Sequence, residues 1–190
     1  MSDLEALYLE GGRELCQTGC CILTAAEDLL GESIRFFEGR GATCSHAAPV
    51  VRLPAGLMSR DRVTLIEALA HGLTPTYLSH YGEGFKGRIF LFTPAGLTPE
   101  IQAAFSAWLL DKMFAGTAYD YSALFAQIGG HVGEDTRKLF CSEAYACALE
   151  AAGLPRLPTA PAGVAPQPSD IASWWPGSLV ELKGPFKEGS

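Results

Sequence analysis

Apolar side chains recur every three or four residues along several stretches of the chain, which is the spacing of a helix with one buried face. The clearest stretch begins at Thr98, a residue suited to capping a helix, and extends to Met113 or Phe114. The side chains predicted to form its buried stripe are Ile101, Phe105, Trp108 and Leu109.

A second helix is predicted from about residue 139, with Cys141 near its start, to about Ala152. Gly153 and Pro155 follow directly, and this pair is a common signal for the end of a helix. Weaker patterns of the same kind predict further helices over residues 3–15, 27–38 and 121–128.

Elsewhere the apolar residues gather in short runs rich in Val, Ile and Leu, which favour strands. Residues 46–53 and 63–69 are two such runs, separated by Pro54-Ala55-Gly56 and a charged stretch, so they predict an antiparallel pair. Residues 77–81 fit neither pattern, and the proline-rich stretch 154–168 predicts an extended loop. The remaining predicted strands cover residues 20–24, 87–93 and 178–183.

The length and these elements predict one domain over residues 1–190. Hydrophobic residues make up 48% of the chain and charged residues 18%, which is enough apolar surface to form a core. The net charge is -7 and the basic residues are scattered, so we expect no nucleic-acid partner. No run approaches the roughly 18 apolar residues of a membrane helix, and we expect no membrane span.

The first residues are acidic and no apolar run follows them, so we expect no signal peptide and a cytoplasmic location. In that compartment the six cysteines are expected to stay reduced. No Cys-x-x-Cys pair occurs, and the spacing from Cys16 to Cys20-Cys21 lacks a matching second pair, so we expect no metal site. No cofactor is expected either.

Cys141 is the candidate nucleophile, because it opens a predicted helix. The unpaired N–H groups and the positive end of the helix dipole favour the thiolate there. The alternative is that Cys141 is a small buried apolar residue, as most unpaired cysteines are.

A thiol nucleophile needs a base, and His46 and Glu67 are the candidates for the base and its orienting group. If the loop between the two predicted strands is centred between Gly56 and Leu57, then Val50 faces Val63 and His46 faces Glu67. A carboxylate beside the imidazole would hold its ring and tautomer. Taken singly, His46 could be a hydrogen-bonded histidine at a strand edge, and Glu67 could be a solvated charge.

The other three histidines are weaker candidates for the base. His71 lies two pleats beyond Glu67, but the following Gly72 suggests the end of a strand and a loop. His80 and His131 lie in polar or glycine-rich surroundings, where surface roles are expected.

Four motifs in this order give the chain a family resemblance. Ser45-His46 opens a strand and Glu67-Ala68 closes the next; Gly116-x-x-Tyr119-Asp120-Tyr121 follows a helix, and Phe140-Cys141-Ser142-Glu143 opens another. Together they resemble the circularly permuted NlpC-type papain-like cysteine hydrolases of the YiiX-like branch, in which histidine precedes cysteine. Residues 166–171 resemble the closing segment of that branch, so the resemblance spans Gly19 to Trp175. The chain departs from the pattern at Gly19-Cys20, where family members commonly have Gly-Asp.

The resemblance implies a permuted papain-like fold of the α+β class, in which a small antiparallel sheet or partial barrel packs against helices. It implies that Cys141 is the nucleophile at a helix N-terminus, that His46 is the general base and then acid, and that Glu67 orients His46. The backbone N–H of Cys141 would be an oxyanion donor. Tyr119 or Tyr121 would line the substrate site, although a buried aromatic pair explains both residues as well.

The function expected from this resemblance is that of a cysteine amidase or peptidase. It would cleave an amide bond in a small peptide, such as one derived from a bacterial cell wall, or in an acylated amine, through a thioester intermediate. One alternative is a lipid acyltransferase or thioesterase of the lecithin:retinol acyltransferase type, which shares the permuted arrangement. Another is a binding or assembly module without turnover.

Overall fold

The computed structural model describes residues 13–26, 44–53, 63–69, 72–81, 85–119, 138–161 and 163–183. The helices predicted over residues 27–38 and 121–128 lie outside these residues, as does most of the helix predicted over residues 3–15. Only α2 (Arg13–Leu15) represents that last helix.

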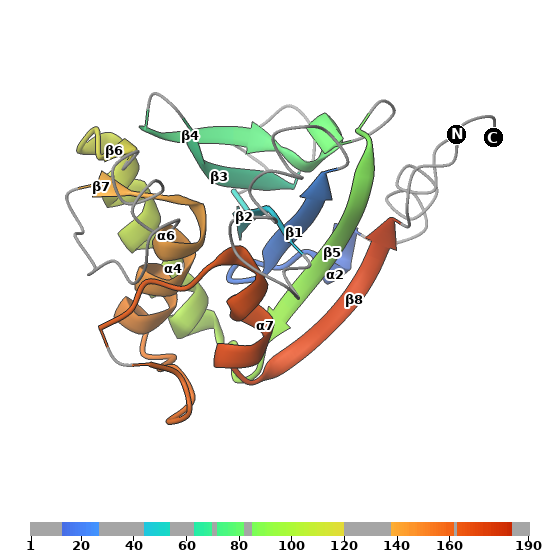
Figure 1. Ribbon diagram of the computed structural model, residues 1–190. Helices are drawn as coiled ribbons and strands as arrows, with labels where there is room; N and C mark the ends of the chain where they lie inside the picture. The colour runs from blue at the N-terminus through green and yellow to red at the C-terminus, as the bar shows by residue number, and fades with distance from the viewer. Residues whose placement is uncertain are drawn as a thin grey trace.

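Six strands form one antiparallel sheet in the order β4-β3-β2-β1-β5-β8 (Figure 1). Five of them correspond to predicted strands, with ends that differ by at most a few residues. Their bounds are β1 (Cys21–Ala26), β2 (His46–Val51), β3 (Thr64–Leu69), β5 (Gly87–Pro94) and β8 (Gly177–Lys183).

The sixth strand, β4 (Gly72–Tyr77), was not predicted, and the expectation of a loop after His71 is wrong for these residues. Pro75 and the initial glycine disguise the strand, because both residues are unusual inside a sheet. Proline is tolerated here because β4 is an edge strand of the described sheet, where one side of the backbone needs no partner. The 3₁₀ helix η3 (Leu78–Tyr81) follows at once and accounts for the stretch that fitted neither pattern.

The two long helices form where their patterns predicted them. Helix α4 (Pro99–Phe114) is capped by Thr98, whose Oγ1 accepts the Ile101 N–H at 3.3 Å. Helix α6 (Cys141–Ala151) packs on β2 and β3, and α4 packs against α6, so both lie on one side of the sheet (Figure 1). The shorter elements are β6 (Ala118–Tyr119), β7 (Lys138–Leu139), η4 (Pro168–Asp170) and α7 (Ile171–Trp174).

The sheet separates two apolar clusters, because alternate side chains of a strand point to opposite faces. On β1, Cys21 and Leu23 belong to the cluster that contains the helices, whereas Ile22 belongs to the other cluster. The largest buried side chains of the helical cluster include Trp175, Tyr145 and Phe105. The chain therefore has the predicted α+β class, with mixed helices and antiparallel sheet. Within the described residues, no helix is long and apolar enough to cross a membrane.

Candidate functional site

Cys141 is the first residue of α6, and its side chain is 7% exposed. The preceding Phe140 is the N-cap, and its apolar side chain makes no capping hydrogen bond. The first hydrogen bond within the helix runs from the Ala144 N–H to the Phe140 carbonyl at 2.9 Å, so the helix itself provides no acceptor for the three N–H groups before it. The sulfur thus lies at the positive end of a largely buried helix.

His46 lies between Cys141 and Glu67. Its Nε2 is 3.0 Å from Glu67 Oε1, and its ring also hydrogen-bonds to the Cys141 sulfur. An ionised carboxylate can only accept, so Nε2 carries a proton and Nδ1 is the nitrogen that faces the sulfur. The His46 side chain is 22% exposed and that of Glu67 is 3% exposed, so the site opens to solvent beside the imidazole.

The charge states of this group follow from its contacts. Burial lowers the pKa of His46, but the Cys141 sulfur and the Glu67 carboxylate together raise it to about 10. Burial raises the pKa of Glu67, but the hydrogen bond and the charge of His46, with further donors, lower it to about 2. At neutral pH the site therefore holds an imidazolium beside an ionised carboxylate.

The predicted pairing of β2 with β3 is wrong by two residues. Val50 pairs with Leu65, not with Val63 as predicted. Continuing the observed register would place Glu67 opposite Ala48, so His46 and Glu67 are diagonal neighbours on one face. The centre of the loop between β2 and β3 was predicted one residue too early in the sequence. The predicted β3 partner of every β2 residue is therefore two residues away from the observed one. An even shift leaves both side chains on the same face, and their length closes the remaining gap.

Two hydroxyl groups that the sequence analysis overlooked also bind Glu67. Thr76 Oγ1 donates to Oε2, and the Tyr81 hydroxyl donates to Oε1. Both hydroxyl groups belong to the segment of β4 and η3, which was not predicted. Thr74 lies directly opposite Glu67, and Thr76 is two residues further along β4. Recognition of β4 from its alternating pattern would have found Thr76, whereas nothing in the sequence pattern points to Tyr81.

The segment around η4 joins the starts of α6 and β2. Ser142 Oγ donates to the Pro166 carbonyl at 2.6 Å. Ser169 Oγ accepts the Cys44 N–H at 3.0 Å and contacts the Cys44 carbonyl at 3.2 Å. These bonds tie the residue after Cys141 and the residue two before His46 to one segment, so they fix the two elements that carry the site.

The predicted substrate-binding residues remain predictions. Tyr119 pairs with Leu139 in the parallel β6–β7 ladder, two residues before Cys141, and the structure describes its backbone only. Tyr121 lies outside the described residues, as do His71 and His131. His80 is exposed in η3 and its ring contacts the edge of the Tyr81 ring, with centroids 5.9 Å apart.

The six cysteines all lie in described and buried positions, and no disulfide joins any of them. Burial, followed by the nearby Cys141 sulfur, raises the pKa of Cys21 well above its ordinary value. Burial likewise raises the pKa of Cys16 to about 12, so both thiols stay protonated at neutral pH. Among the described residues, no group of three or more His, Cys, Asp or Glu side chains is arranged to hold a metal ion.

Comparison with known proteins adds no homologue: no family model matches the chain, and no curated protein is similar to it.

Proposed function

We propose that the protein is a cysteine amidase or peptidase with a circularly permuted papain-like fold. The observation that carries this proposal is the position of the His46 ring, which bonds to Cys141 on one side and to Glu67 on the other. Nucleophile, base and orienting group are thereby arranged as acyl-transfer chemistry requires.

The arrangement of elements supports the resemblance beyond the three side chains. The helix that begins at Cys141 packs on β2, the strand that begins at His46. The β6–β7 ladder brings the Gly116-x-x-Tyr119 motif beside the residues that precede Cys141. The closing segment contacts the start of the same helix through Ser142. Three of the four motifs and the closing segment, which are distant in the sequence, therefore meet around one helix N-terminus.

In the proposed reaction the Cys141 sulfur bonds to an amide carbonyl carbon and the carbon–nitrogen bond breaks. The His46 imidazolium gives its Nδ1 proton to the departing amine. Water then adds to the thioester, His46 accepts one of the water protons, and the carbon–sulfur bond breaks to release the acid. The Cys141 N–H, which the helix leaves without an acceptor, would stabilise the oxyanion in both steps.

The proposed substrate is a small peptide, such as one derived from a bacterial cell wall, or an acylated amine. This substrate class comes from the family resemblance. Amide chemistry agrees with the charges in the site, because the amine leaving group needs a proton and the imidazolium supplies one.

Alkylation by iodoacetamide near neutral pH tests the proposal, with Cys147 as an internal control. The two cysteines lie in the same helix and have nearly the same exposure, 7% and 9%. Only Cys141 has the helix start and His46 beside it, so we expect rapid modification confined to Cys141 and lost in His46→Ala. Peptide mass spectrometry would locate the label. If Cys141 reacts no faster than Cys147, the proposal fails.

A covalent trap tests the second half of the chemistry. On brief incubation with p-nitrophenyl acetate, we expect an acetyl group on the wild-type Cys141 and none at that position in Cys141→Ala. In His46→Ala we expect little acetyl-enzyme to form, and slow release of any that does, because water then lacks its base. A label spread over lysines instead of Cys141 would contradict an acyl-enzyme.

A further inference from the structure

We propose that Tyr81 and Thr76 are positioning residues, which hold the Glu67 carboxylate in the one orientation that fixes the ring of His46. The inference rests on the proposed function, since it assigns these hydroxyl groups to the same site. Both hydroxyl groups donate to Glu67 and would act through it.

The hydrogen bonds of Glu67 leave its carboxylate little freedom to rotate. Oε1 accepts from His46 Nε2 and from the Tyr81 hydroxyl, while Oε2 accepts from Thr76 Oγ1. Three donors from three elements, β2, η3 and β4, thus fix both oxygens. Because the carboxylate is 3% exposed, water cannot readily replace a donor that is lost.

Tyr81 is itself held by packing as well as by its hydrogen bond. Its ring lies edge-on to Phe85, with centroids 5.1 Å apart, and the side chain is 8% exposed. Burial, the charge of Glu67 and its hydrogen bond raise the pKa of Tyr81 far above its usual range. The phenol therefore remains a donor at every pH at which the protein would work.

A fixed carboxylate has a definite consequence for the histidine. It keeps the proton on Nε2, and Nδ1 is left to exchange a proton with Cys141. If Tyr81 no longer donates, the Glu67 carboxylate stays ionised at the pH of the His46 titration but turns more freely. The hydrogen bond from His46 Nε2 to Glu67 is then less well oriented, so His46 loses part of the interaction that keeps it protonated.

The test is an NMR titration of His46 in protein labelled with ¹⁵N-histidine, with the His46 signal identified through His46→Gln. The decisive variant is Tyr81→Phe, which keeps the ring beside Phe85 and removes only the hydroxyl. The matched control is Tyr145→Phe, which removes another buried tyrosine hydroxyl, one that donates to the Gly19 carbonyl at 2.8 Å.

In Tyr81→Phe we expect the titration midpoint of His46 to fall by about one pH unit, a tenfold easier loss of its proton. Above the midpoint, we expect the Nε2–H tautomer to give way to a mixture. Tyr145→Phe should change neither observation, even if it destabilises the fold. Among the described residues, the other titratable groups around this network are Cys141 on α6, Cys21 on β1 and His80, whose ring lies against that of Tyr81; all these variants retain them.

Thr76 provides an independent second test in case Tyr81→Phe does not fold. Thr76→Val keeps the shape and removes the hydroxyl, so it should lower the His46 midpoint in the same direction, whereas Thr76→Ser should restore it. A midpoint and tautomer that stay at the wild-type values in both Tyr81→Phe and Thr76→Val would overturn the proposal. Slow alkylation of the wild-type Cys141 would instead refute the proposed function and leave this titration result standing.

Discussion

Replacement of Glu67 by glutamine isolates the charge of the buried carboxylate. Glutamine has the same shape, and its carbonyl oxygen can accept from both His46 and Tyr81 in place of Oε1. Its NH₂ group can then donate to Thr76, whose hydroxyl turns to accept. The substitution therefore keeps a hydrogen-bonding scheme while it removes the negative charge.

The size of the effect follows from the pKa of Glu67, which is about 2 in the fold against an ordinary value of 4.5. At 1.4 kcal/mol per pH unit this difference corresponds to about 3 kcal/mol of stability. Because the folded pKa is lower than the unfolded one, the stabilisation is fully present above pH 4.5. It is lost as the pH falls from 4.5 through 2, where both states bind the proton.

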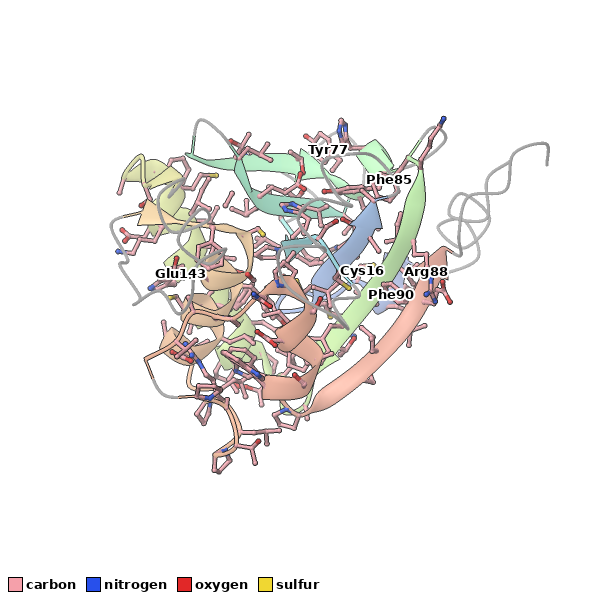
Figure 2. All side chains as sticks on the ribbon, viewed as in Figure 1. Cys16, Tyr77, Phe85, Arg88, Phe90 and Glu143 are labelled. Carbon is pink, nitrogen blue, oxygen red and sulfur yellow. The ribbon has the colours of Figure 1, made fainter. Side chains whose placement is uncertain are left out.

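Urea unfolding followed by tryptophan fluorescence at a series of pH values measures this difference, since Trp175 is fully buried. We expect the wild type to exceed Glu67→Gln by about 3 kcal/mol at pH 7, with the gap narrowing steadily below pH 4.5. Glu181→Gln is the control, because Glu181 pairs with Arg88 at 2.7 Å where β5 and β8 run side by side, but both side chains are exposed (Figure 2). The difference in stability between the wild type and Glu181→Gln should be much smaller. A gap for Glu67→Gln that is equal at pH 3 and pH 7 would refute the reasoning.

Three further predictions concern the site and its frame. Cys141→Ser should lower the pKa of His46 from about 10 toward its ordinary 6.5, because the sulfur is a main cause of the increase. NMR titration measures the pKa of His46 in the variant, and an unchanged value would assign the increase to Glu67 alone. Ser142→Ala should cost about 1 to 3 kcal/mol in urea unfolding, since it leaves the Pro166 carbonyl without its donor, and a loss near zero would contradict this. Thr98→Ala should cost about 1 kcal/mol through the loss of the α4 cap, and Thr98→Ser should recover most of it.

The elements that could be predicted from the sequence are those whose local pattern agrees with their final environment. Helix α4 has a capping residue and an apolar stripe, and two members of that stripe, Phe105 and Leu109, are fully buried as expected. Strand β4 has the opposite property, because Pro75 is locally unfavourable for a strand. Only its position at the sheet edge makes that residue acceptable, and an edge position is a property of the whole sheet.

The pairing of His46 with Glu67 was predicted even though the register was wrong, and the reason lies in the period of a strand. Side chains alternate with a period of two, so a register error of two residues preserves the face on which each side chain lies. An error of one residue would have put Glu67 on the helical face, which Ile66 and Ala68 occupy in the structure. The side of the sheet on which a side chain lies can therefore be predicted with less information than the residue with which it pairs.

The same period of two explains why the hydroxyl groups around Glu67 were not predicted. Thr74 lies opposite Glu67 and Thr76 is the next residue on that face, so the contact follows directly once β4 is paired with β3. Tyr81 requires in addition that η3 turns the chain back over the same face, which depends on how the ring packs against Phe85. The proposed nucleophile and its proposed base could be identified from local signals, whereas the groups that hold the carboxylate depend on tertiary contacts. Variants at Thr76 and Tyr81 therefore test the fold around the site more directly than variants at Cys141 do.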